Sequence, residues 1–580
     1  MARTMPTDQG YETKRQRLWR MSAIWKSERS SYEAHWRELG DYTFPRRTRF
    51  FESDRNRGDR RSQKIINETG TLAARTLRAG MFTGITSPAR PWRRLTTADP
   101  DLSKYGAVKN WLYQYNERLS MLNRRSNFYN VAPTLFGDLG IFATGCIGIF
   151  PDDDDLYRFY AFPVGSYWLA TDRRGVVDTF MREFQMTVRQ LIMEFGDPQA
   201  SGDEKWRPFS VTVRNLWDKG QYETPINVTM VIHPNADWDP RQLDARFKRF
   251  AGCYYETGTT TGGLLASPSA EATFLRETGY DFFPIFAPRW DVTGEDVYGT
   301  SCPGMDALGS IKELQSLMKK KAKGLQKQLD PPLTGPTGLK TQKTSLLSGD
   351  VTYLDTREGM QGLRPIHETK FSHADVREDI GSLERRINRT FYADLFMAIT
   401  DMEGVQPRNE KELHMRDQER LLELGPVLER TNDEFLDPLT RAETHYMMIH
   451  GLMPPPPDEL KDQPVNVEYI SMMAQAQKLV GIAGTERFLA FVGNLSGVWP
   501  DVRDKIDADF AVDDYGDRMG AAAPMIIEED VVKKIRAARM QATQQQAQAQ
   551  QATNTAEAAK TLSQADMSSD NALTRVMAGA

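Results

Sequence analysis

Hydrophobic positions at helical spacing dominate the first 140 residues of the chain. In residues 11–40, Leu18, Ile24 and Trp25 fall near helical spacing with charged residues between them. This pattern predicts an amphipathic helix. Similar patterns predict three more helices, followed by a strand. The helices cover residues 65–84, 104–125 and 130–140, and the strand covers residues 145–150.

Between about residues 150 and 250 the pattern changes to short β-like segments with turn signals such as Asp172–Gly175. One helix is predicted here, over residues 187–195. Because strands and helices do not alternate regularly, the pattern favours an α+β fold over a doubly wound parallel sheet. The predicted strands are residues 157–162, 166–171, 177–184 and 228–233.

An ordered succession of patterns lies between Cys302 and His450. Two helical patterns enclose a segment rich in Gly, Pro and Thr, and a short loop separates them from a very long helical pattern. The parts, in order, are the helix 311–329, the Gly/Pro/Thr-rich segment 330–366, the helix 372–395, the loop 399–408 and the helix 409–450.

Gly425 and Pro426 interrupt this last helical pattern. Proline lacks the N–H that bonds to the preceding turn, and its ring crowds that turn, so the pair predicts a kink. Helical patterns return at 469–480 and 485–494, and residues 516–524 have the composition of a linker. An Ala/Gln-rich stretch at 528–551 favours helix, and the small polar remainder to Ala580 predicts disorder unless assembly orders it.

Composition limits the class of protein. A chain of 580 residues is too long for one hydrophobic core and predicts roughly three or four domains. Its net charge of −5, from 74 basic and 79 acidic residues, is not that of a tight nucleic-acid binder, although loose contact with DNA stays open. Three scattered cysteines make a disulfide framework unexpected. Residues 1–20 lack the apolar core of a signal peptide, and no apolar run is long enough to predict a membrane span.

Motifs for chemistry are missing from the sequence. The stretch Gly335–Thr341 fails the spacing of a phosphate-binding loop, and no Gly-x-Gly-x-x-Gly follows a strand. The seven histidines include no pair at metal-binding helical spacing, and the acidic run Asp152–Asp155 is typical of an exposed turn. We therefore expect no catalytic residues, no cofactor, no metal and no intrinsic ATPase.

Two basic segments each keep two interpretations. The run from Arg46 to Lys64 fits a solvated loop, or a contact with phosphate or a partner protein. The helix 311–329 carries lysines near one face and apolar residues on another, which fits a solvated face or a ring of positive charge around an anionic polymer. The lysines are Lys312, Lys319, Lys323 and Lys327, and the apolar residues are Leu314, Leu317, Met318 and Leu325.

Several stretches, in this order along the chain, resemble the portal, or head-to-tail connector, proteins of short-tailed bacteriophages. Each is weak alone, but together they cover the chain from its N-terminal quarter to about residue 440. They are Leu77–Pro88 with Pro91-Trp92, Pro163–Trp168, Gly175–Arg182, Arg289-Trp290 with Tyr298-Gly299, and Leu422–Arg430.

The resemblance implies a predominantly helical α+β, multi-domain portal fold that assembles into a ring, usually of twelve copies, around a central channel. It also implies a division of each subunit into parts. These are a wing at 1–300, a stem helix at 301–329, a clip at 330–371, a second stem helix at 372–398, a tunnel loop at 399–408, a long kinked helix with the rest of the wing at 409–465, a crown at 466–525, and an Ala/Gln-rich helix, which could form a barrel, with a flexible tail at 526–580.

The implied function is that of a structural ring at one capsid vertex, through which double-stranded DNA is packaged and ejected. The implied partners are the terminase large subunit, tail adaptor proteins, the major capsid protein, scaffold and internal core proteins, with no membrane. The implied location is the virion, with assembly in the host cytoplasm. Candidate channel residues are Lys319, Lys323, Asp401, Met402, Glu403 and Arg408, and the candidate helix kink is Gly425-Pro426.

Two other classes compete with this interpretation. One is a metal-dependent DNA-processing enzyme, which the absence of a compact acidic motif disfavours. The other is a different ring component of the head–tail junction, such as an adaptor, for which 580 residues is large.

Overall fold

The structure is a computed structural model that divides the chain into two units. The first unit comprises Met1–Arg93, Glu117–Met453 and Tyr469–Gln477, and the second comprises Arg94–Asn116, Pro454–Glu468 and Lys478–Ala580. The structure describes residues 14–50, 58, 60–89, 91–99, 102, 105–197, 202, 204–259, 274–329, 331–334, 364–365, 373–396, 424–460, 465–469, 487–497, 499–519 and 529–563.

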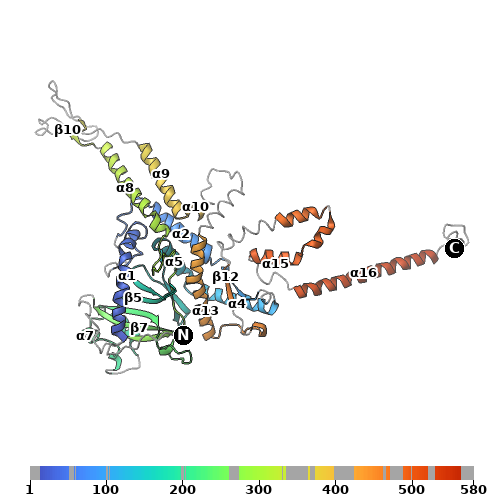
Figure 1. The fold of residues 1–580 in the computed structure, drawn as a ribbon, viewed down its shortest axis with the longest axis horizontal. Helices are drawn as coiled ribbons and strands as arrows, with labels where there is room; N and C mark the ends of the chain where they lie inside the picture. The colour runs from blue at the N-terminus through green and yellow to red at the C-terminus, as the bar shows by residue number, and fades with distance from the viewer. Residues whose placement is uncertain are drawn as a thin grey trace, which may run out of the picture. The chain divides into compact units, whose positions relative to one another are not determined.

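A five-stranded antiparallel sheet, in the order β4-β5-β6-β7-β8, forms one part of the first unit (Figure 1). Its inner register aligns Met181, Val231 and Cys253. Because side chains alternate between faces along a strand, these three point to the same face. The strands are β4 (Tyr167–Thr171), β5 (Val177–Thr187), β6 (Pro225–Pro234), β7 (Phe250–Thr259) and β8 (Arg276–Tyr280).

Helices cover both faces of this sheet. On one face, Leu18 and Trp25 of α1 (Lys14–Tyr42) pack with the three aligned residues and with Trp168. On the other, the buried side chains of α6 (Val188–Phe195) and α7 (Val211–Asp218) pack against Ile226 and Val228. Thr187 and Ser210 cap these two short helices, each accepting a hydrogen bond from a backbone N–H.

A smaller antiparallel sheet, in the order β3-β2-β9, lies beside a pair of buried helices. Helix α5 is apolar nearly all round, as expected of a helix enclosed by other elements, and it packs on α2 and β3. The elements are β2 (Ile147–Asp152), β3 (Leu156–Ala161), β9 (Ile285–Phe286), α2 (Thr69–Ile85) and α5 (Phe128–Phe142).

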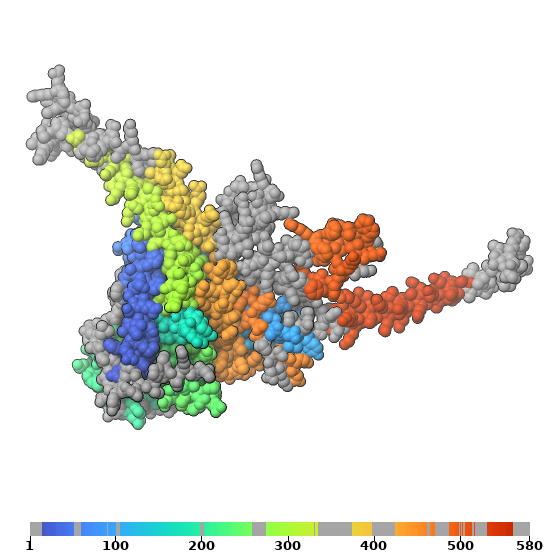
Figure 2. All heavy atoms as spheres, viewed as in Figure 1, coloured from blue at the N-terminus to red at the C-terminus, as the bar shows by residue number. Residues whose placement is uncertain are grey.

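Helices α8 (Pro303–Leu329) and α9 (His373–Thr390) lie side by side, and their atoms touch along the pair (Figures 1 and 2). Ile380, Leu383 and Ile387 form the buried stripe of α9. In the sequence between these two helices, β10 (Leu333–Thr334) pairs antiparallel with β11 (Arg364–Pro365).

The predicted helix 372–395 is wrong in one detail. Tyr392 has a φ of +54°, which ends α9 before the short α10 (Ala393–Phe396). Phe396 then lies so close to Gly80 of α2 that a Cβ at residue 80 would collide with its ring.

The described part of the predicted long helix comprises three segments. They are α12 (Gly425–Thr431), the π-helical segment η5 (Asn432–Leu436) and α13 (Asp437–Ile449). Pro426 occupies the first turn of α12, where no backbone N–H is needed. Residues 409–423 lie outside the described part of the chain, so the kink stays a prediction.

In the second unit, β1 (Arg93–Thr97) pairs with β12 (Val465–Tyr469), each strand extending by one residue into the first unit. Helix α4 (Gly106–Arg125) begins in the second unit and ends in the first. Arg536 of α16 (Glu529–Ser563) binds both carboxylate oxygens of Asp509 in α15 (Ala508–Met519) at 2.6 Å each. Short helical turns complete the described elements: η2 (Glu204–Trp206), η3 (Ala245–Phe247), η6 (Asp458–Leu460) and η7 (Pro500–Lys505).

Two sequence expectations for this unit are wrong. The predicted linker at 516–524 begins inside a helix, because α15 runs to Met519. Residues 552–563, expected to be disordered, continue α16 to Ser563. Alanine and glutamine favour helix, and that propensity extends past residue 551.

Candidate functional site

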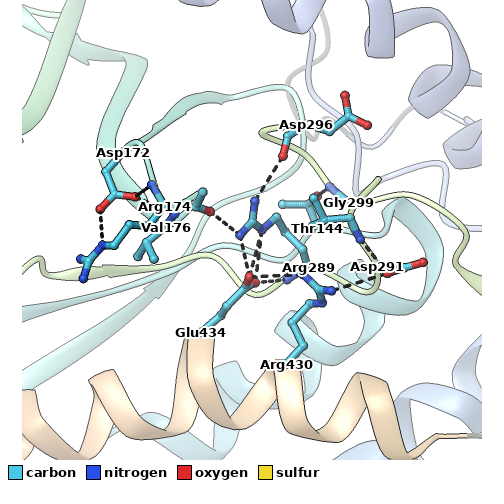
Figure 3. Close-up of polar contacts among 12 residues, drawn as sticks. Thr144, Asp172, Arg174, Val176, Arg289, Asp291, Asp296, Gly299, Arg430 and Glu434 are labelled. Carbon is cyan, nitrogen blue, oxygen red and sulfur yellow. Dashed lines mark hydrogen bonds and ion pairs between the residues drawn. The ribbon is translucent and has the colours of Figure 1, made fainter. Parts of the chain in front are cut away.

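Arg289 joins three segments that are far apart in the sequence. Its backbone N–H and its guanidinium donate to Glu434, with 2.6 Å between Nη2 and Oε1. The same guanidinium donates to the carbonyl oxygens of Gly175 at 2.7 Å and Asp296 at 3.2 Å (Figure 3). The Arg289 side chain is only 5% exposed, so these contacts replace water as its hydrogen-bond partners. We call this cluster the arginine hub.

A π-helical turn positions Glu434 for this contact. The N–H of Asp437 donates to the carbonyl of Asn432, five residues back. The next residue, Pro438, has no N–H, and in a regular α-helix its ring would crowd the carbonyl of Glu434. The wider π turn relieves that crowding, and such turns are frequent at functional sites.

The turn between β4 and β5 presents the carbonyl of Gly175. Asp172 accepts hydrogen bonds from the backbone N–H groups of Arg174 at 2.8 Å and Val176 at 3.0 Å (Figure 3). Partial burial raises the pKa of Asp172, but these hydrogen bonds outweigh it and hold the pKa below its usual value. Gly175 has a φ of +75°, a conformation that favours glycine.

A second layer of contacts surrounds the hub. Arg430, one turn before Glu434, lies 3.6 Å from Asp291. The N–H of Gly299 donates to Thr144 Oγ1 at 2.8 Å. The hydroxyl of Tyr298 accepts from the N–H of Leu169 in β4. The hub and its second layer thus bring together three of the sequence stretches that carried the family resemblance: Gly175–Arg182, Arg289-Trp290 with Tyr298-Gly299, and Leu422–Arg430.

Two further ion pairs are buried in the first unit. Arg47 binds both oxygens of Asp138 on α5, with Nη2 and Oδ2 2.6 Å apart. Arg93 binds Glu443 on α13, and both side chains are at most 1% exposed. Burial raises the pKa of Asp138 and of Glu443, and the adjacent guanidinium opposes that rise in each case. Removing either partner would leave an uncompensated buried charge.

The base of the α8–α9 pair is held by Gln315. Its side-chain oxygen accepts from the N–H groups of Ile66 at 2.7 Å and Asn67 at 2.8 Å, and its amide donates to the carbonyl of Asn67. The Asn67 side chain in turn donates to Glu384 of α9 at 2.9 Å. One asparagine therefore connects both helices at this level.

The structure brings together few of the predicted site residues. Lys319 and Lys323 are both exposed on α8. Asp401, Met402, Glu403 and Arg408 lie outside the described part of the chain. The basic run has a mixed outcome, because Arg47 pairs with Asp138 and Lys64 pairs with Asp41 at 2.6 Å, which makes two of its members intrachain partners.

Sequence reasoning missed the arginine hub and the buried pairs. Asp138, a lone carboxylate within the apolar stretch of α5, was a signal that a partner existed. Its partner, Arg47, is 91 residues away, and no local pattern identifies it. The acidic run Asp152–Asp155 lies at the β2–β3 turn, as predicted.

The described residues contain neither a cluster of metal ligands nor a helix that could span a membrane. No group of three or more His, Cys, Asp or Glu side chains there has the arrangement of a metal site. No helix among those same residues is both long and apolar enough to span a bilayer.

Comparison with known proteins identifies the class of protein. The family model described as "Bacteriophage head to tail connecting protein" matches residues 15–527. The portal protein of Salmonella phage epsilon15 is 42% identical over 568 residues, covering 97% of this chain and 98% of that protein. The probable portal protein of Bordetella phage BPP-1 is 38% identical over 555 residues, covering 95% and 96%.

A solved chain from the virion of a native gene transfer agent particle has a TM-score of 0.34 at 13% identity, covering 73% of this chain and 87% of that one. The two sequence relatives and the family match decide the class. The chain belongs to the bacteriophage head-to-tail connecting, or portal, protein family. It is an α+β virion component with a connector function, and both relatives are named as portal proteins.

Proposed function

We propose that this chain forms a ring, usually of twelve copies, at a single capsid vertex, and that double-stranded DNA is packaged and ejected through it. The observation that carries the proposal is the 42% identity to a portal protein along almost the whole length of both chains. The chain acts by shaping and positioning DNA and partners, without catalysis.

The proposed division of the subunit follows the succession of elements in the chain. Residues 1–300 and 409–465 form the wing, 301–329 and 372–398 the stem, 330–371 the clip, 399–408 the tunnel loop, 466–525 the crown and 526–580 a C-terminal helix with its tail. The structural division places residues 94–116 with the C-terminal unit, so the wing of this map spans both units.

The α8–α9 pair supports the stem and clip assignments. The adjacent helices α8 and α9 precede and follow the Gly/Pro/Thr-rich segment 330–366, which we call the excursion. At its two ends, β10 pairs with β11. Because this pairing joins the two ends of residues 335–363, the excursion starts and finishes at one place. A segment whose two ends are joined in this way suits docking of the terminase large subunit, and later of a tail adaptor.

The tunnel loop would keep DNA mobile. A channel dense in Lys and Arg would release counterions from the phosphates and hold the duplex tightly. Residues 399–408 carry Asp401 and Glu403 against a single Arg408. This excess of negative charge would repel phosphates and centre the duplex. The loop lies outside the described part of the chain, so its support is the sequence and the family.

The ring and the loop are tested separately. Native mass spectrometry of the full chain should show a closed ring, and a chain that stays monomeric at all concentrations and salts would contradict the ring. The double substitution Asp401→Lys and Glu403→Lys should leave rings intact but lower the yield of DNA-filled capsids. Asp153→Lys with Asp154→Lys, at the exposed β2–β3 turn, is the charge-matched control. Equal yields from both variants would refute the loop assignment.

A further inference from the structure

The C-terminal half of α8, which we call its outer half, presents two lysines that have no acidic partner among the described residues. Lys319 and Lys323 are exposed, and no carboxylate of the described residues forms an ion pair with either. Lys312, earlier on the same side of the helix, does have one, because its Nζ lies 2.6 Å from Glu38 of α1. The same face is therefore paired near the body of the unit and unpaired beyond it.

This lysine face points away from α9. Residues two apart on a helix lie on nearly opposite sides of it. Leu317 and Lys321, each two residues before one of these lysines, are partly buried in the outer half of α8. Lys319 and Lys323 therefore lie on the other side of α8 and are exposed.

The first two turns of α9 carry exposed carboxylates, although the exposed Arg377 lies beside them. Glu378 and Asp379 are exposed, while the buried stripe that begins at Ile380 faces the neighbouring helices. No carboxylate–lysine pair involving Glu378 or Asp379 occurs within the described part of the chain. One side of the helix pair is thus positive, and the other carries negative charge.

The two charged faces lie at the same level along the helix pair. Asn67 contacts both Gln315 of α8 and Glu384 of α9, which fixes one common level. The helices run in opposite directions, and each rises about 1.5 Å per residue. Four residues beyond Gln315 is Lys319, and five residues before Glu384 is Asp379. The positions of Lys323 and Glu378 differ in level by only about 3 Å, within reach of a lysine side chain.

We propose that Lys319 and Lys323 bind Asp379 and Glu378 of α9 in a neighbouring copy of this chain. This interface rests on the proposed ring. In a ring, each copy uses one face to contact the next copy and a different face to receive the previous one. Opposite charges at one level on opposite sides of one helix pair meet that requirement. The proposal assigns to a protein neighbour the two lysines that the sequence pattern suggested for DNA.

Each such pair is exposed and individually weak, but every interface of the ring repeats it. Reversing both charges converts attraction into repulsion at each interface. At equal total concentration, the ratio of chains in rings to unassembled chains should therefore be at least about tenfold lower for the variant Lys319→Glu with Lys323→Glu than for the natural chain. Assembly of the natural chain should also weaken as salt is raised.

The decisive experiment is a charge exchange. Native mass spectrometry and sedimentation velocity compare the natural chain, the lysine double variant, Glu378→Lys with Asp379→Lys, and the quadruple variant. Each double variant should lose rings, and the quadruple variant should regain them. Arg207→Glu with Lys219→Glu, both exposed near α7, is the charge-matched control and should assemble normally. Circular dichroism melts should be alike for all variants.

The outcomes separate the interface from the ring itself. A natural chain that never forms rings overturns the proposed ring and this interface with it. Normal rings from the lysine double variant overturn the interface alone, and a lower yield of DNA-filled capsids in that variant would assign the lysines to DNA. Failure of the quadruple variant to regain rings overturns the pairing with Glu378 and Asp379.

Discussion

The arginine hub and the outer half of α8 use charge in opposite ways. At the hub, Arg289 is 5% exposed, and its donors are occupied by Glu434 and two backbone carbonyls. On α8, Lys319 and Lys323 are exposed and have no acidic partner among the described residues. A buried charge must be satisfied within its own chain, whereas an exposed charge remains available to another molecule. The first region therefore serves the fold of the subunit, and the second is available for the contact that we propose with a neighbouring copy.

The contrast predicts different consequences of losing one charge. Arg289→Ala removes the hydrogen bonds to Glu434, which keeps only Arg430 at 3.9 Å, and takes away the donors to the carbonyls of Gly175 and Asp296. It should lower the free energy of unfolding of the unassembled chain by about 3–5 kcal/mol. Lys323→Ala should change it by less than about 0.5 kcal/mol, because an exposed surface substitution removes little. Urea denaturation followed by circular dichroism measures both. Equal effects of the two substitutions would remove the distinction between the regions.

Backbone crowding sharpens the comparison without changing charge. A Cβ at Gly299 would collide with the carbonyl of Ala143, whereas one at Gly309 on α8 meets no atom within 4 Å. Gly299→Ala should therefore destabilise the unassembled chain by about 2–3 kcal/mol through overpacking. Gly309→Ala should stabilise α8 by about 0.5–1 kcal/mol through helix propensity. Thermal melts of the two variants measure this, and a neutral Gly299→Ala would show that the hub tolerates movement.

The last prediction concerns how the stability of the folded chain depends on pH. Burial lowers the pKa of His233 in β6 to about 4. Its Nδ1 lies 2.8 Å from the carbonyl oxygen of Pro234 and carries the donated proton, while the buried Nε2 has no partner in the described structure. Between about pH 6.5 and 4, the unfolded chain binds a proton that the folded chain does not. Stability should therefore fall by up to about 3 kcal/mol as pH decreases through that window.

His233→Gln should flatten this part of the stability–pH curve, measured by urea denaturation at each pH. His450→Gln is the matched control, since His450 is exposed at the end of α13. If both variants keep the natural slope, another group is responsible for the pH dependence.

The sequence predicted helices and strands best where periodicity was strong. Helix 11–40 corresponds to α1, and residues 177–184 fall within β5. The last two strands of the sheet, β7 and β8, were not predicted as such. Helix α8 begins at Pro303, eight residues before the predicted start, because proline is well suited to the first helical turn.

The candidate site was less predictable than the fold. Helical spacing placed Lys319 and Lys323 on one face, and the structure has both exposed on α8. The spacing could not tell whether the face meets DNA or protein, because its neighbours lie on other elements or on other copies. Nor could it detect the π turn, because that turn depends on how Pro438 and Glu434 are accommodated together.

By itself, the sequence determined the α+β class, the helix–excursion–helix succession and the resemblance to portal proteins, because periodicity, turn residues and motif order are local properties. The tertiary structure decided which charged side chains pair within the chain and which stay exposed. Arg289 and Glu434 are 145 residues apart, and only folding brings them together. The level shared by Lys319 and Asp379 likewise exists only because α8 and α9 pack side by side, with Asn67 in contact with both. Pairing across such separations depends on long-range packing, which no local pattern encodes.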